Sequence, residues 1–147
     1  MEARTNLLPR AVQPGEGTVL IPGRVLLRIS ASQTDGAFEV LELAGPDGDG
    51  PPPHIHHDRQ ELFYVLQGQV EFTLGEERIA VDAGSVVFVP RRTRHAFKLG
   101  PDAKLLGWVA PAGLEGFFRE LGAGMAAGKS HQEIREALEA KYDSHPA

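Results

Sequence analysis

Residues 48–68 read GDGPPPHIHHDRQELFYVLQG and place two histidines and a glutamate at a spacing typical of metal ligands. Side chains alternate between the two faces of a β-strand, so His54 and His56 would project from one face toward a common ion. Glu61 would join them from the next strand. Two imidazoles and a carboxylate in this arrangement predict a metal site.

A second stretch, residues 84–95, reads GSVVFVPRRTRH and ends on a third histidine. His95 reaches the first pair only if its strand folds back against theirs, which a closed or nearly closed antiparallel barrel allows. Phe63 shares the strand face of Glu61, and this face would be buried. Phe97 likewise shares the face of His95. The sequence therefore predicts four candidate ligands that face an apolar cavity.

The composition favours one all-β domain with an ordinary core. The chain has 147 residues, of which 41% are hydrophobic, and its 17 Gly and 11 Pro lie mostly between short β-rich runs. A net charge of -5 gives no general basic surface, so we expect no nucleic-acid partner. The chain has no cysteine, so nitrogen and oxygen must hold any metal.

The sequence shows no membrane or secretion signal. No apolar run approaches the roughly 20 residues that span a bilayer, and the N-terminus lacks the pattern of a secretory leader. We therefore expect a cytoplasmic protein without a membrane partner.

Nine short apolar runs predict nine strands, and glycine-containing turns separate several of them. We expect residues 1–17 to form an N-terminal arm, residues 18–110 the barrel, and residues 111–147 a C-terminal helical segment. The nine runs cover residues 19–21, 24–29, 38–43, 62–66, 69–74, 78–81, 86–89, 96–99 and 105–109.

The C-terminal segment has a helical pattern. Apolar residues over 114–121 predict a short helix that stops at Gly122 and Gly124. Ser130 and Glu133 form a capping-box pattern, which predicts the start of a second helix.

The other histidines give a weaker signal. His57 has the opposite strand parity to the two candidate ligands beside it, so we expect it to be solvated or to support a ligand. His131 and His145 are interpreted as surface residues.

Three arginines, Arg91, Arg92 and Arg94, form the densest basic run of the chain. We interpret them as a charged rim. One of them would also be placed to steer an anionic or phenolate substrate into the mouth of the barrel.

Both stretches resemble the two sequence motifs of the cupin superfamily, and the resemblance extends over residues 36–109. There are two departures: Arg92 stands where the second motif usually has Gly, and Leu99 stands where it usually has Asn. These departures affect the expected turn geometry and leave the ligand positions intact. The matching positions are Gly48, His54, His56, Glu61 and Gly68 in the first motif and Gly84, Pro90 and His95 in the second.

The resemblance implies an all-β fold, a cupin barrel (double-stranded β-helix or jelly roll) with a short C-terminal helical appendage. It also implies that one divalent transition metal, Fe, Mn, Ni, Cu or Zn, is bound by His54, His56, Glu61 and His95. Cupins commonly dimerise, and exposed edge strands can pair between copies, so we expect a homodimer.

Further short patterns, at residues 35–38, 52–57, 63–66 and 111–118, are similar to the small single-domain cupins related to quercetin 2,3-dioxygenase. In those enzymes the matching glutamate is the base. Glu61 would therefore take the acidic hydroxyl proton of a polyphenolic (flavonol-like) or enolisable aromatic substrate that then reacts with dioxygen. Three alternatives remain: a zinc-dependent aromatic polyketide cyclase, an isomerase, and a non-catalytic small-molecule-binding cupin.

Overall fold

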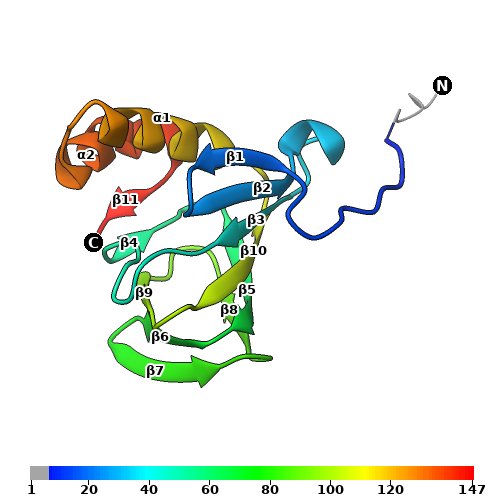
Figure 1. The fold of residues 1–147 in the computed structure, drawn as a ribbon. Helices are drawn as coiled ribbons and strands as arrows, with labels where there is room; N and C mark the ends of the chain where they lie inside the picture. Colours follow the sequence, from blue (N-terminus) through cyan, green and yellow to red (C-terminus); the bar gives the residue numbers. More distant parts are fainter. Residues whose placement is uncertain (1–6) are drawn as a thin grey trace.

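Two antiparallel β-sheets form most of the molecule in the computed structural model, which describes residues 7–147 (Figure 1). The strands are β1 (Thr18–Ile21), β2 (Val25–Ile29), β3 (Glu39–Leu43), β4 (His54–Ile55), β5 (Gln60–Gln67), β6 (Gln69–Leu74), β7 (Glu77–Asp82), β8 (Val86–Val89), β9 (His95–Leu99), β10 (Lys104–Ala110) and β11 (His145–Pro146). The larger sheet has the strand order β1-β2-β3-β10-β5-β8, and the smaller sheet has the order β11-β4-β9-β6-β7. The predicted all-β barrel architecture is confirmed.

All nine strands predicted from the apolar runs are present, as β1 to β3 and β5 to β10. Two further strands, β4 and β11, were not predicted. Each has only two residues, too few to produce a run of alternating side chains. Proline also lies at both, since Pro53 precedes β4 and Pro146 is part of β11, and proline disfavours a strand prediction.

The core between the sheets follows directly from strand alternation. On β5 the side chains of Glu61, Phe63 and Val65 are buried, while those between them are exposed. Phe63 packs against Phe72 and Phe97, with ring centroids 5.4 and 5.8 Å apart. The same inward parity that builds the core therefore also turns Glu61 into the barrel.

Helix α1 (Glu115–Ala126) is longer than predicted, because it continues through Gly122 and Gly124. The prediction that these glycines stop the helix is wrong. A Cβ atom at Gly122 would lie 2.9 Å from the backbone oxygen of Leu20, and one at Gly124 would lie 2.7 Å from Cδ1 of Ile134. Both glycines instead allow α1 to approach β1 and the second helix closely.

Helix α2 (His131–Tyr142) begins as predicted. Ser130 accepts a hydrogen bond from the backbone N–H of Glu133, and the Glu133 side chain accepts one from the backbone N–H of Ser130, which completes the capping box. The chain then returns to the barrel as β11, which pairs with β4. Figure 1 shows both helices together at one end of the molecule, beside β1 and β11.

The N-terminal part contains little regular structure. Residues 7–17 contain no helix or strand, and residues 1–6 of the predicted arm lie outside the described residues. A short 3-10 helix (Ala31–Gln33) connects β2 to β3. Among residues 7–147, neither α1 nor α2 has the length and apolar character needed to cross a lipid bilayer.

Candidate metal centre

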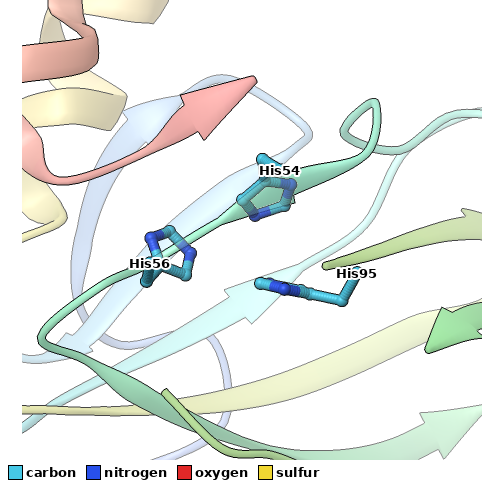
Figure 2. A group of neighbouring side chains, drawn as sticks. All are labelled: His54, His56 and His95. Carbon is cyan, nitrogen blue, oxygen red and sulfur yellow. The ribbon is translucent and has the colours of Figure 1, made fainter. Parts of the chain in front are cut away.

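The four candidate ligands converge inside the barrel. His54 on β4 is paired with His95 at the start of β9, so both arise from the smaller sheet. His56 follows β4, and Glu61 comes from β5 of the larger sheet. All four residues are buried, with 2 to 8% of their surface exposed. Figure 2 shows the three imidazoles turned toward a common space.

The donor atoms of the cluster are close enough to share one ion. The ring nitrogens offered by His54, His56 and His95 all lie within 4.8 Å of one another. One Glu61 carboxylate oxygen lies 2.9 Å from Nε2 of His56, and the other lies 3.4 Å from Nε2 of His95. The structure thus brings all four predicted residues together, while their binding of a metal stays a prediction.

Backbone carbonyl groups fix the orientation of all three imidazoles. A carbonyl oxygen only accepts hydrogen bonds, so an Nδ1 atom facing one must carry the proton, and Nε2 keeps its lone pair. Metal-binding histidines are commonly held in this way. The Nδ1 distances are 2.8 Å from His54 to Pro52, 2.7 Å from His56 to Asp143 and 2.8 Å from His95 to Thr93.

Neutral imidazoles in this cluster would turn nitrogen lone pairs toward the Glu61 carboxylate. Among the described residues, the buried Nε2 atoms of His56 and His95 have no partner with hydrogen-bond geometry, although the Glu61 oxygens are close by. Lone pairs on nitrogen and carboxylate oxygen that face one another repel unless a proton or a metal cation lies between them. The residues therefore fit a divalent transition metal held by nitrogen and oxygen.

The pKa values reflect the same arrangement. Burial, with the neighbouring His95 and His56, lowers the pKa of His54 to about 3, so this imidazole is neutral at physiological pH. Burial alone would raise the pKa of Glu61, but the imidazoles of His56 and His95 outweigh it and hold the pKa below its usual value. Glu61 is thus a carboxylate that can act as a ligand or accept a proton.

A cavity of about 110 Å³ opens beside the cluster. His54, His56, His95 and Glu61 supply its polar wall. The other walls are largely apolar and are supplied by both sheets and by α1, among them Leu41, Phe63, Val109, Leu114, Phe117 and Leu121. A reacting group could therefore lie against the candidate ligands in a largely apolar environment.

Comparisons with known proteins place the chain in a family. A model of the cupin domain matches residues 40–106. The chain is 37% identical over 124 residues to quercetin 2,3-dioxygenase of Bacillus subtilis, which covers 82% of this chain and 37% of that protein. It is 30% identical over 94 residues to quercetin 2,3-dioxygenase of Aspergillus japonicus, with 58% and 27% covered. Residues 40–106 of this chain form a cupin domain.

A solved structure supports the same assignment. The polyketide cyclase RemF from Streptomyces resistomycificus matches this cupin with a TM-score of 0.57 and 26% identity, over 71% of this chain and 80% of that one. The cupin spans only about a third of the length of the two quercetin 2,3-dioxygenases that it matches.

The two departures from the cupin motifs do not disturb the cluster. Arg92, which stands at the usual glycine position, adopts a left-handed conformation with φ of 64°. Its backbone N–H donates to the carbonyl oxygen of His56 at 2.7 Å, so the turn supports the ligand loop even without glycine. Leu99, at the usual asparagine position, is buried and lines the cavity.

The arginine run of this cupin lies away from the cavity. Arg91, Arg92 and Arg94 are exposed and none of them lines it, which agrees with the interpretation of a charged rim, while a role in steering substrate stays a prediction. Other charged residues line the cavity instead, and sequence reasoning missed them. They are Arg24, Asp49 and Arg135.

A second histidine cluster lies near the first. His145 is only half-buried and stacks on the exposed His57, with ring centroids 4.1 Å apart and an interplanar angle of 13°. Nε2 of His145 lies 3.0 Å from the carboxylate of Asp143, and Nδ1 lies 3.2 Å from that of Glu139. The interpretation of His145 as a simple surface residue is therefore wrong, while His131 is exposed as predicted.

Asp143 contacts the ligand loop, and no sequence pattern predicted this contact. It lies beyond α2, 87 positions from His56 along the chain, yet its carbonyl oxygen fixes the His56 ring. Its carboxylate accepts hydrogen bonds from the backbone N–H groups of His57 and Asp58, both at 2.9 Å. No spacing rule links these residues, because the contact depends on the path of α1 and α2.

Proposed function

We propose that this cupin is a metal-dependent dioxygenase acting on a polyphenolic (flavonol-like) or enolisable aromatic compound bound in the apolar cavity. The observation that carries the proposal is the buried Glu61 carboxylate, which faces two imidazole nitrogens at the polar wall of the cavity. The similarity to two quercetin 2,3-dioxygenases supports the choice of reaction.

Each residue of the cluster has a defined role in this proposal. His54, His56, His95 and Glu61 would hold one divalent transition metal, which would supply Lewis acidity and, if redox-active, electron transfer to dioxygen. Glu61 would accept the hydroxyl proton of the substrate, since it is an ionised carboxylate at the polar wall of the cavity. The apolar walls would exclude water from the deprotonated substrate.

The proposal is tested by oxygen consumption with a panel of flavonols, using protein loaded in turn with Fe, Mn, Ni or Cu. We expect turnover with at least one metal. Glu61→Gln should retain metal but lose about 10²- to 10⁴-fold in turnover, the usual contribution of a general base. Glu71→Gln, an exposed change on β6, is the matched control. Full activity of Glu61→Gln would remove the assignment of Glu61 as the base.

A second candidate function, an aromatic polyketide cyclase, is supported by the similarity to RemF. Cyclisation needs a Lewis acid such as zinc and no dioxygen. Turnover of a polyketide under argon by the zinc-loaded protein would favour this function over the dioxygenase. Specific ligand binding without turnover in either assay would favour a non-catalytic binding protein.

We also propose that the protein is a homodimer. The outer face of β5 and the edge strand β8 expose a set of large apolar side chains with 37 to 61% of their surface accessible, a pattern typical of interfaces. Light scattering coupled to size exclusion should give about twice the chain mass of 15.9 kDa, and a monomer would contradict the proposal. The exposed residues are Leu62, Tyr64, Leu66, Val86 and Phe88.

A further inference from the structure

Arg135 is a cation without an ion-pair partner that lines the cavity of the candidate metal centre. It lies on α2, beside the buried Ile134, and its side chain extends to the cavity wall. Its Nε atom is buried and has no hydrogen-bond partner among the residues that the structure describes. A buried N–H without a hydrogen-bond acceptor is costly, so a ligand that supplies an acceptor to the Arg135 side chain would be bound favourably.

The charged groups around Arg135 do not form an ion pair with it in the described part of the chain. Asp49 on the cavity wall attracts the Arg135 guanidinium, but its carboxylate is paired with Arg24 at 2.6 Å, and Arg135 has no ion pair among residues 7–147. The Arg135 guanidinium lies 5.4 Å from the centre of the Phe117 ring, which holds it against the apolar wall. Burial lowers the pKa of Arg135, although a guanidinium stays charged at any physiological pH.

Arg135 also lies where the inner cavity meets an outer groove. The groove lies between α2 and the smaller sheet, and five residues line both hollows, with Arg135 among them. The other four are Gly50, Pro51, Phe97 and His131. Glu61 and Arg135 both line the inner cavity, so a ligand bound at Glu61 would share that cavity with the Arg135 guanidinium.

We propose that Arg135 binds the carboxylate of the substrate, and that the protein acts on aromatic carboxylic acids. The planar guanidinium matches a carboxylate in a two-point hydrogen bond. The inner cavity, at about 110 Å³, is comparable to the cavity of about 150 Å³ that holds benzene in another protein, so it would take one ring of a substrate whose remainder extends into the outer groove. This inference rests on the proposed function for the reaction at Glu61, and it narrows the substrate to acids.

The test uses benzoate and its uncharged analogue benzamide as probes, with binding to the full-length, metal-loaded protein measured by calorimetry. We expect benzoate to bind more tightly than benzamide. Arg135→Gln should weaken benzoate by at least about tenfold and leave benzamide unchanged, because only the charged hydrogen bonds are lost. Arg135→Lys, which keeps the charge but not the planar donor pair, should fall between the two.

Arg119→Gln is the matched control, since it removes one exposed positive charge from α1 without touching the cavity. An equal loss of benzoate affinity in this variant would reduce the effect to long-range charge and overturn the proposal. So would an equal loss of benzamide affinity in Arg135→Gln, or the absence of benzoate binding to the unaltered protein. Thermal melting of each variant establishes that it is folded.

Metal-free protein provides one further comparison, which distinguishes benzoate binding by Arg135 from benzoate binding by the metal. If the carboxylate bound the metal instead, removal of the metal would abolish benzoate binding and Arg135→Gln would have no effect, which would overturn the assignment. Because the readout is binding, the result stands whatever the oxygen-consumption assay shows. Failure of the dioxygenase proposal and failure of the Arg135 proposal are therefore distinguishable.

Discussion

Two histidine clusters lie side by side in this protein, and their bonding differs completely. In the buried cluster of His54, His56 and His95, each Nδ1 faces a carbonyl oxygen and each Nε2 is left for a ligand. In the outer cluster, both nitrogens of His145 already face carboxylates, and the carboxylate of Asp143 accepts two backbone N–H groups. Both clusters bring three donor residues within 4.8 Å.

Proximity of donors is therefore not a sufficient sign of a metal site. The imidazoles of His57 and His145 are stacked with an interplanar angle of 13°, so the nitrogen lone pairs of the two rings lie in nearly parallel planes and do not converge on one ion. The outer cluster instead fastens the C-terminal segment to the loop after β4. The comparison predicts that the inner cluster binds metal and that the outer one supports it.

The largest effect is expected from removing a ligand of the inner cluster. Protein purified without chelator or affinity metal should contain about one divalent metal per chain by elemental analysis, and His56→Ala should contain clearly less, because one of the four candidate ligands is removed. His57→Ala changes a neighbouring histidine and should retain full stoichiometry. Equal loss of metal from His56→Ala and His57→Ala would contradict the prediction that only the inner cluster binds metal.

A smaller effect is expected from loosening the outer cluster. Asp143→Ala removes the acceptor for the N–H groups of His57 and Asp58 and places alanine at a φ of 53°. With the carbonyl that orients His56 displaced, metal affinity should fall about 10- to 100-fold, measured by competition with a chelator. His145→Ala, which leaves these bonds in place, should stay within about twofold of the unaltered protein. Unchanged affinity in Asp143→Ala would show that the tail does not support the site.

The two buried glutamates also differ from each other. Glu39 accepts backbone N–H groups from Gly113 and Leu114, yet burial raises its pKa, whereas the pKa of Glu61 is lowered. A raised pKa means that the folded state binds the Glu39 proton more tightly, so this residue stabilises the fold less as pH rises through and above 4.5.

Glu39→Gln should remove the part of the pH dependence of stability that arises from Glu39. Relative to the unaltered protein, the free energy of unfolding of Glu39→Gln should increase as pH rises, as measured by urea denaturation across a pH series, while metal stoichiometry stays the same. Glu71→Gln is the exposed control and should show no such trend. A parallel pH profile for Glu39→Gln and the unaltered protein would contradict the assignment.

The smallest effect concerns the turn that supports His56. Arg92 has a φ of 64°, which costs a residue with a side chain about 1 kcal/mol, and glycine would relieve most of it. Arg92→Gly should therefore raise the free energy of unfolding by about 0.5 kcal/mol without changing metal affinity. Arg91→Gly, at a position without a positive φ, should instead destabilise the protein. Loss of stability in Arg92→Gly would show that its side chain matters more than its backbone.

The sequence predicts this site well where strand periodicity is sufficient. Glu61 and His95 turn inward by the same alternation that buries Phe63 and Phe97, so the local pattern predicts the strand face that each occupies. Residues whose place depends on tertiary packing are not predictable in this way. Arg135 lies on the cavity, rather than on a free helix face, only because α1 and α2 pack against the barrel.

The glycines of α1 show the same limit. From sequence, Gly122 and Gly124 resemble helix stops, because glycine most often ends helices. In the structure they face Leu20 and Ile134, and the need for close approach outweighs their low helix propensity. Which meaning applies depends on what lies opposite, and a single sequence does not contain that information.

The most direct test of the account is an anomalous-scattering map from a crystal of the full-length protein grown with cobalt as the sole divalent metal. The account predicts one strong peak per chain, in contact with the Nε2 atoms of His54, His56 and His95 and with a carboxylate oxygen of Glu61. A cobalt peak between His57, Asp143 and His145, with none at the inner cluster, would contradict it.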